Sequence, residues 1–171
     1  MKNNRCEGNG ARVTNFAEPT AKRKEVCRMS KYVLLKNNGA VEVKELDNGI
    51  NLETMYKWIG NDCRCIDIAE SVINKKMGCN ILLIFDDEFL LNNLDPQPNK
   101  IASLLFGYSI RTSDCLCGNV IIAKADEDET VGFTDEEIEK LKRLIKIAEN
   151  FVPIIKFKVQ EPGVTFIPGN Y

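Results

Sequence analysis

The stretch GNVIIAKADEDETVGFTDEEIEKLKRLIKIAENF, residues 118–151, decides the fold because it predicts a strand followed by a long helix. Residues 118–125 form a largely apolar run, which predicts a strand. The acidic residues 126–129 are expected to form the loop after it. Thr134 and Glu137 hold the two positions of a capping box, so the helix is expected to follow Thr134.

The helix expected after Thr134 is amphipathic. Four apolar residues at helical spacing form its predicted buried stripe: Ile138, Leu141, Ile145 and Ala148. Phe133 stands before the cap, where it can pack against Ile138. Acidic residues lead the helix and basic residues follow, which matches the helix dipole. The sequence therefore predicts a helix that lays one apolar face on the rest of the domain.

Residues 31–46 carry the signal of a β-hairpin. Asn38-Gly39 lies between two β-rich runs, and this dipeptide favours the positive φ angles of a type I′ turn. Residues 52–59 then predict a short helix, which Asn51 can cap and Gly60 can end. The expected buried face of this helix contains four residues: Leu52, Met55, Tyr56 and Ile59.

Three more strands and one more helix complete the expected fold. The strands are predicted at residues 63–70, 79–85 and 154–159. A short helix is expected at residues 100–106, closed by Gly107. Together these elements predict an α+β fold, in which a mostly antiparallel, twisted sheet of about five to six strands is packed by two or three helices.

Composition divides the chain into three parts. Residues 1–28 lack periodicity and are expected to form a flexible basic leader, residues 29–159 a single α+β domain, and residues 160–171 an irregular tail. Seven basic and three acidic side chains give the leader a net charge of +4, so the net charge of −2 for the whole chain leaves −6 on residues 29–171. Because phosphate backbones repel an acidic surface, direct binding of nucleic acid is not expected.

The chain contains no histidine and seven cysteines. Without histidine it cannot form Ser-His or Cys-His nucleophilic pairs, or any metal site that uses histidine. No apolar run reaches the ~20 residues of a membrane helix, and the N-terminus shows no apolar segment typical of a signal peptide. These features predict a cytoplasmic protein that does not bind membranes, and in a reducing cytosol an odd number of cysteines argues against a disulfide framework.

Three stretches of the chain resemble a known family. They are GAVEVKELDNGINLETMYKWIG (39–60), LIFDDEFLLNNLDPQPNKIASLLFG (83–107) and GNVIIAKADEDETVGFTDEEIEKLKRL (118–144). The matching motif positions are Leu94, Pro98-Asn99-Lys100, Gly118 and Phe133-Thr134-Asp135. On these residues the chain resembles the domain of unknown function 3846, common in phages, plasmids and gut Gram-positive bacteria. The resemblance implies an α+β domain that originates in a phage or other mobile element, and it transfers no catalytic residues.

Two Cys-x-Cys pairs are the candidate metal ligands. Cys63 and Cys65 in DCRC have the same spacing as Cys115 and Cys117 in DCLC, and four thiolates together could hold zinc. Structural zinc sites, however, usually use Cys-x-x-Cys turns, whereas a strand separates the thiols of Cys-x-Cys by about 6.6 Å. Core cysteines that pack as small apolar residues are the favoured interpretation, ahead of zinc and of redox or disulfide chemistry. No cofactor is therefore expected.

A small-ligand site is predicted around Pro98-Asn99-Lys100. Asn99 can cap the next helix, and Lys100 offers a cation near the helix start that could hold an anion or a nucleotide. Tyr108 and Arg111 follow that helix and could stack on or pair with the same ligand. A capped helix that carries a surface lysine is the simpler interpretation.

Three functions remain open. The first is a non-catalytic binding protein of a phage or mobile element, whose acidic surface binds a host protein, such as a defence protein, that normally grips nucleic acid. The second is a small-ligand binder, in the form of a homo-oligomer that sequesters a nucleotide signal through Asn99, Lys100, Tyr108 and Arg111. The third and least favoured is a metal-dependent hydrolase built on the carboxylates of residues 86–88 and 126–129. A protein without catalytic activity is the expectation.

Overall fold

The computed structural model describes residues 29–60, 62–92, 97–107, 115–127 and 129–154. The predicted leader (1–28) and tail (160–171) lie outside these residues. So does the strand expected at 154–159, except for Ile154, which ends a turn of 3-10 helix.

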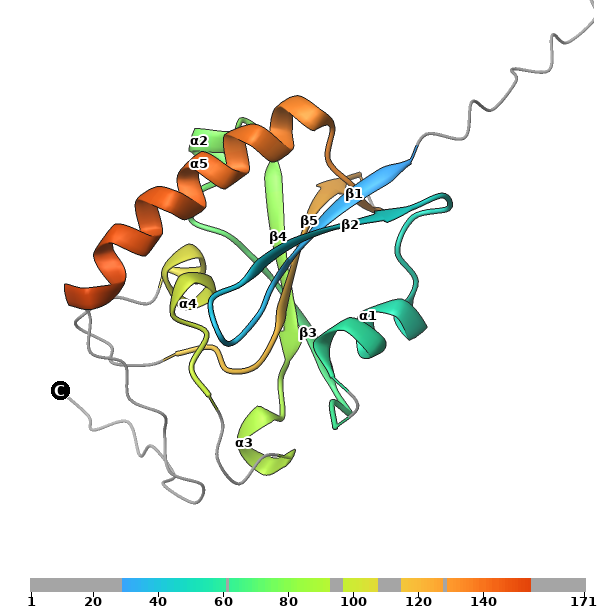
Figure 1. The fold of residues 1–171 in the computed structure, drawn as a ribbon. Coiled ribbons are helices and arrows are strands. Elements are labelled where there is room, and N and C mark those ends of the chain that lie inside the picture. The colour runs from blue at the N-terminus through green and yellow to red at the C-terminus, as the bar shows by residue number, and fades with distance from the viewer. Residues whose placement is uncertain (1–28, 61, 93–96, 108–114, 128, 155–171) are drawn as a thin grey trace, which may run out of the picture.

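A six-stranded antiparallel sheet forms the centre of the domain (Figure 1). Its strands are β1 (Ser30–Leu35), β2 (Val41–Leu46), β3 (Ile66–Glu70), β4 (Asn80–Asp86), β5 (Val120–Asp126) and β6 (Glu129–Val131). The strand order is β2-β1-β5-β4-β3, and β6 pairs with β5. The longest strands, β4 and β5, therefore lie in the middle, as their apolar sequences predict.

The helices lie on both faces of this sheet. They are α1 (Leu52–Ile59), α2 (Asn74–Met77), α3 (Phe89–Asn92), α4 (Lys100–Phe106) and α5 (Asp135–Phe151), with a 3-10 turn at Val152–Ile154. Helices α2 and α3 are single turns of four residues each. The three longer helices match the expected number, and the predicted α+β class is confirmed for the part of the chain that the structure describes.

Helices α2, α4 and α5 cover one face of the sheet (Figure 1). The largest core cluster lies beneath them and joins β1, β4 and β5 to α4 and α5. Leu83 and Ile122 from the central strands and Leu141 from α5 are fully buried in it. Ile138 and Ile145 are also buried, and Ala148 is half-buried against the same cluster, so the stripe predicted for α5 faces the core. Each fully buried side chain of this kind contributes about 1.5–3 kcal/mol relative to exposure.

On the other face, the short helix α1 covers a second core cluster. Met55 and Ile59 of α1 pack with Ile84 and Ile121 of the sheet. Tyr32 is fully buried here, and its hydroxyl oxygen accepts a hydrogen bond of 3.0 Å from the backbone N–H of Ile50. The buried Tyr32 hydroxyl therefore has a hydrogen-bond partner, as buried polar groups in proteins usually do.

Two sequence expectations need correction on this face and at its edge. Of the four residues expected on the buried face of α1, Met55 and Ile59 are buried and Tyr56 is half-buried, but Leu52 is 60% exposed. The strand expected over residues 63–70 begins at Ile66, so Cys63 and Cys65 precede it. The chain is still in a turn at Cys63, where the backbone N–H donates to the carbonyl of Gly60 at 3.2 Å.

The hairpin between β1 and β2 is confirmed, but its predicted type I′ turn is wrong. A type I′ turn needs positive φ angles at both Asn38 and Gly39, but of these two residues only Gly39 has one, of 86°. Gly39 N–H donates to the carbonyl of Lys36, and Lys36 N–H donates to the carbonyl of Ala40, each at 2.9 Å. This pattern is a type I turn followed by a glycine bulge, which adds one residue to the two-residue loop that Asn-Gly favours.

Candidate functional site

Asn99 is a buried structural residue at the start of α4. Its side-chain oxygen accepts a hydrogen bond from Ala102 N–H at 3.1 Å, which confirms the predicted helix cap. Its amide nitrogen donates to the carbonyls of Leu35 and Gly118, each at 3.0 Å. Asn99 is only 1% exposed and joins the end of β1, the start of α4 and the approach to β5. Both of its amide hydrogens are therefore used inside the protein rather than offered to a ligand.

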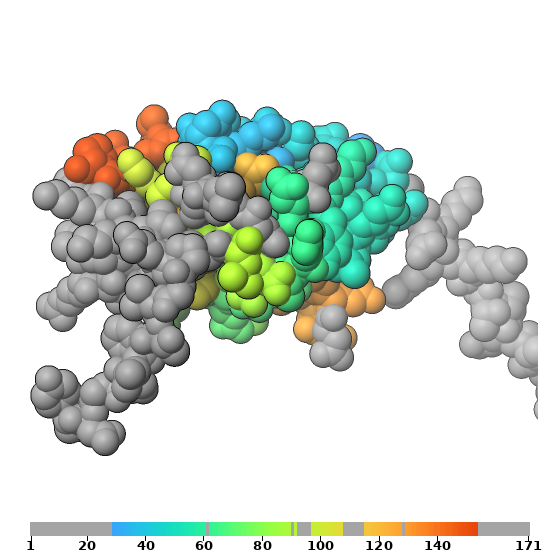
Figure 2. Space-filling model, turned by 90° about the horizontal axis from the view of Figure 1, so that it is seen from below, coloured from blue at the N-terminus to red at the C-terminus, as the bar shows by residue number. Residues whose placement is uncertain are grey.

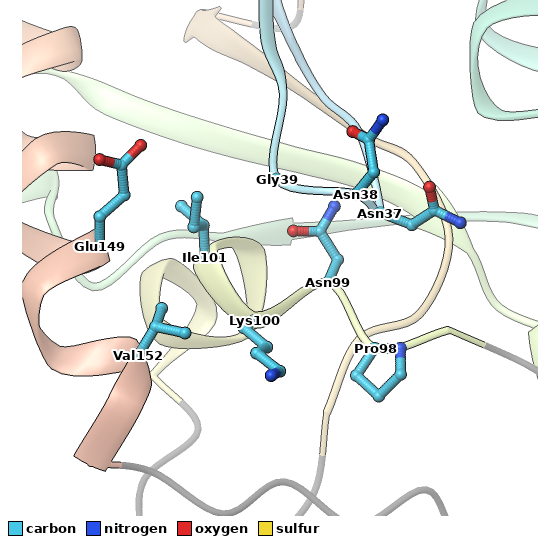
Figure 3. A pocket seen from close by; sticks show the side chains of 9 residues that line it. All are labelled: Asn37, Asn38, Gly39, Pro98, Asn99, Lys100, Ile101, Glu149 and Val152. Atoms are coloured by element: carbon cyan, nitrogen blue, oxygen red, sulfur yellow. The ribbon is translucent and has the colours of Figure 1, made fainter.

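Lys100 lies on the rim of a cavity of about 370 Å³, named here the asparagine–lysine cavity. The cavity is lined by Asn37, Asn38, Gly39, Pro98, Asn99, Lys100, Ile101, Glu149 and Val152. Figure 3 shows the two asparagines of the hairpin on one side of α4 and Glu149 of α5 on the other. The volume falls in the lower part of the range for small-molecule sites. Tyr108 and Arg111, the other predicted ligand residues, lie outside the described residues.

A second cavity, of about 170 Å³, brings together one cysteine from each Cys-x-Cys pair. Cys63 and Cys117 both line it, beside Asp62 and Asp86, so we name it the thiol–carboxylate cavity. Cys65, in contrast, is exposed. No three His, Cys, Asp or Glu side chains among the described residues are placed to hold one metal ion. The four candidate sulfurs therefore do not form a common metal site.

The thiols in and near this cavity are protonated at neutral pH. Burial, and next the neighbouring Asp86 carboxylate, raise the pKa of Cys63 to about 12. A hydrogen bond with Cys115, and then burial, raise the pKa of Cys117 as well. Since the thiolate is the nucleophilic form, neither cysteine has the lowered pKa of a catalytic thiol.

An acidic surface, named here the acidic end face, surrounds Cys65 where β3 begins and β4 ends. It consists of Asp67 and Asp87, which are exposed, and Glu88, which is half-buried, whereas the neighbouring Asp86 is only 9% exposed and lines the thiol–carboxylate cavity. The register pairs Ile66 with Asp86 and Asp67 with Phe85, and Asp87 N–H donates to the carbonyl of Cys65 at 3.0 Å. Desolvation, and then the charges of Glu88, Asp87, Asp67 and Asp86, raise the pKa of Cys65. Figure 2 views this end of the molecule, with the residues around α3 in lime near its centre.

The ion pairs between described residues lie elsewhere on the domain. Lys124 of β5 contacts Glu137 of α5 at 2.9 Å, and other pairs lie on the β1–β2 hairpin and along α5. None of them includes a carboxylate of the acidic end face. Among the described residues, no lysine or arginine therefore forms an ion pair with this face.

Asn119 is a positioning residue that the sequence did not identify. Its amide nitrogen donates to the carbonyls of Trp58 at 3.2 Å and Ile59 at 3.1 Å, at the end of α1. Its side-chain oxygen accepts from Asn37 N–H at 3.3 Å. Asn119 thereby holds α1 and the hairpin on either side of the thiol–carboxylate cavity, which it also lines. The last carbonyls of every helix lack partners within the helix, so the sequence predicts that α1 needs a donor at its end. It does not show that the distant Asn119 supplies that donor.

A family model described as a domain of unknown function, DUF3846, matches residues 29–146. The chain belongs to the DUF3846 family. No curated protein and no solved structure matches it. The two cavities and the acidic end face all include residues of the matched DUF3846 region. In the described ranges, no helix of this DUF3846 protein is long and apolar enough to cross a membrane.

Proposed function

We propose that this DUF3846 protein is a non-catalytic binding protein, which docks a positively charged surface of another protein against its acidic end face. The observation that carries the proposal is that Asp67, Asp87 and Glu88 lie at one end of the sheet, beside the buried Asp86, with no described lysine or arginine paired to them. A partner that supplies the missing positive charge gains electrostatic attraction at this surface.

The chemistry of the acidic end face resembles that of a phosphate backbone. Both present several negative charges within a short distance, so a protein with a basic nucleic-acid groove can bind either of them. The charge of −6 on residues 29–171 extends the same attraction over the rest of the domain. The proposal includes a host protein of this kind as the partner, a phage or mobile element as the source, and the cytoplasm as the place of action.

The protein side of this interface is built on firm backbone. Asp67 and Asp86 belong to paired strands, and Asp86 also accepts a hydrogen bond of 2.9 Å from Glu88 N–H. Because the turn after β4 is held in this way, the carboxylates keep their positions before a partner arrives. Such preorganisation lowers the entropy cost of binding.

Capture from a bacterial lysate tests the proposal when three forms of the chain are compared. The first is the wild type and the second carries Asp67→Asn, Asp87→Asn and Glu88→Gln. The third is a control with the same change in net charge, Asp126→Asn, Glu129→Gln and Glu136→Gln, at the opposite end of the sheet. We expect the wild type and the control to capture the same basic protein and the acidic-face variant to lose it. Equal capture by all three forms would refute the proposal.

A second candidate function, a small-ligand binder, is favoured by the asparagine–lysine cavity. Its cation, Lys100, and the side-chain amides of Asn37 and Asn38 suit the phosphate and base of a nucleotide. Glu149 opposes an anion in the same cavity, which places this function second. Calorimetry with a nucleotide panel should show that Lys100→Ala weakens binding, whereas Lys142→Ala on the exposed side of α5 does not. A nucleotide that binds both variants equally would remove Lys100 from the site.

A further inference from the structure

The thiol–carboxylate cavity leads from the surface to a buried carboxylate. Its lining residues Asn37 and Asp62 are exposed, whereas Asp86 and Cys117 are only 9% and 1% exposed. The volume of about 170 Å³ lies below the range of sites that enclose a whole small molecule. Among the described residues, no three His, Cys, Asp or Glu side chains are placed to hold a metal ion. The cavity therefore has the size for one side chain.

Asp86 has no counterion among the described residues. Its carboxylate accepts a hydrogen bond of 2.9 Å from Glu88 N–H and a further one from the Cys63 thiol, and both donors are neutral groups. None of the ion pairs between described residues includes Asp86 or Asp62. Because burial costs a carboxylate its hydration, a cation in the cavity would offset this cost.

Two further lining residues suit an arginine side chain. Phe89 provides a half-buried aromatic ring on which a guanidinium group can stack, and Ile59 provides buried apolar surface for the methylene stem. The planar guanidinium group also presents several N–H donors that match a carboxylate, whereas the ammonium group of lysine is a point charge. The ring, the carboxylates and the apolar wall together favour arginine over lysine.

We propose that the thiol–carboxylate cavity receives one arginine side chain of a protein partner. The guanidinium group pairs with Asp86 and Asp62 and stacks on Phe89. This inference rests on the proposed docking function, because Asp86 lines the cavity and is followed directly by Asp87 and Glu88 of the acidic end face. Arginine side chains that fill pockets are among the strongest contacts of protein interfaces. The cavity thus adds selectivity for one side chain to a face that otherwise selects only for charge.

Amide NMR spectra of the isotope-labelled, full-length chain test the pocket with three capped tripeptides. These are Gly-Arg-Gly, Gly-Lys-Gly and Gly-citrulline-Gly, in which citrulline is a neutral analogue of arginine. We expect the arginine peptide to shift the amide signals of Gly60, Asp62 and Phe89. The lysine peptide should bind about threefold more weakly or worse, because its ammonium group cannot stack on the ring as a guanidinium does. The citrulline peptide should cause no shift.

These peptide comparisons use only the wild-type chain, so they decide the proposal even if a variant fails to fold. No binding of the arginine peptide would overturn the pocket, and so would shifts that leave Gly60, Asp62 and Phe89 unchanged. Lysine or citrulline peptides that bind as tightly as the arginine peptide would also overturn it.

Two variants test the two contacts of the guanidinium group separately. Asp86→Asn should weaken binding of the arginine peptide by about tenfold, and Phe89→Leu by about threefold. The control, Asp126→Asn, removes the same charge as Asp86→Asn from an exposed position at the opposite end of the sheet. It should change binding by less than about twofold. Equal weakening by Asp86→Asn and Asp126→Asn would refute the pocket.

The peptide titration and the lysate capture separate this pocket from the proposed docking function. If a basic protein is captured but the arginine peptide does not bind, the docking face stands and the pocket is overturned. If the arginine peptide binds as expected but no basic protein is captured, the pocket stands and the proposed docking function fails.

Discussion

Asn99 and Asn119 show how much of this fold depends on single buried amides. Asn99 bonds to three segments, and Asn119 joins the end of α1 to the hairpin turn. The sequence predicted the helix cap at Asn99, because Asn followed by a helical run is a local signal. It could not predict the bonds to Leu35 and Gly118, since these depend on how distant segments pack. Because the sequence does not reveal that these bonds occupy its amide, Asn99 was expected to bind a ligand as well as to cap the helix.

Replacement of Asn99 by alanine should lower the free energy of unfolding by about 2–4 kcal/mol, because it removes a helix cap and two buried hydrogen bonds. Lys100→Ala is the matched control, since this exposed neighbour should change stability by no more than about 0.5 kcal/mol. Urea unfolding followed by circular dichroism measures both. A loss of similar size in the two variants would contradict the role assigned to Asn99.

At the scale of elements, α5 was the most predictable helix because its signals are local. Its capping box is present as expected, with Thr134 and Glu137 bonded to each other at 2.8 and 3.3 Å. The ion pair between Glu137 and Lys124 of β5 was not predictable, because it depends on where the helix crosses the sheet. The turn type of the hairpin was also missed, since Asn-Gly favours a two-residue loop but does not enforce one.

The pH dependence of stability should report the position of Glu137. Burial alone would raise the pKa of this carboxyl, but the hydrogen bond from the Thr134 backbone and the contacts with Lys124 lower it below 4.5. Because its folded-state pKa is the lower one, its contribution is present above pH 4.5 and is lost as the pH falls through the folded pKa. The free energy of unfolding of Glu137→Gln should therefore fall less steeply than that of the wild type as the pH decreases. Identical acid profiles in urea titrations would contradict this assignment.

At the scale of the whole molecule, the acidic end face is a product of strand pairing. Asp67 and the run Asp86-Asp87-Glu88 are separate in the sequence and lie at the same end of the sheet because β3 and β4 are antiparallel neighbours. The sequence predicted both strands and the net charge, but not the register that brings the charges together. For the same reason, the sequence could not tell whether the two Cys-x-Cys pairs meet in space. In the structure only Cys63 and Cys117 share a cavity.

The rate at which the captured basic protein associates with the domain tests the central claim most directly, when measured over a range of salt concentrations. Charges on an exposed face act over about 10 Å at 0.1 M ionic strength, so the association rate of the wild type should fall as salt increases. The variant with Asp67→Asn, Asp87→Asn and Glu88→Gln should associate more slowly at low salt and depend less on salt. The control variant at Asp126, Glu129 and Glu136 should behave as the wild type does. If the association rate and its salt dependence fall by the same amount in both variants, net charge alone drives binding and the acidic end face is not the docking site.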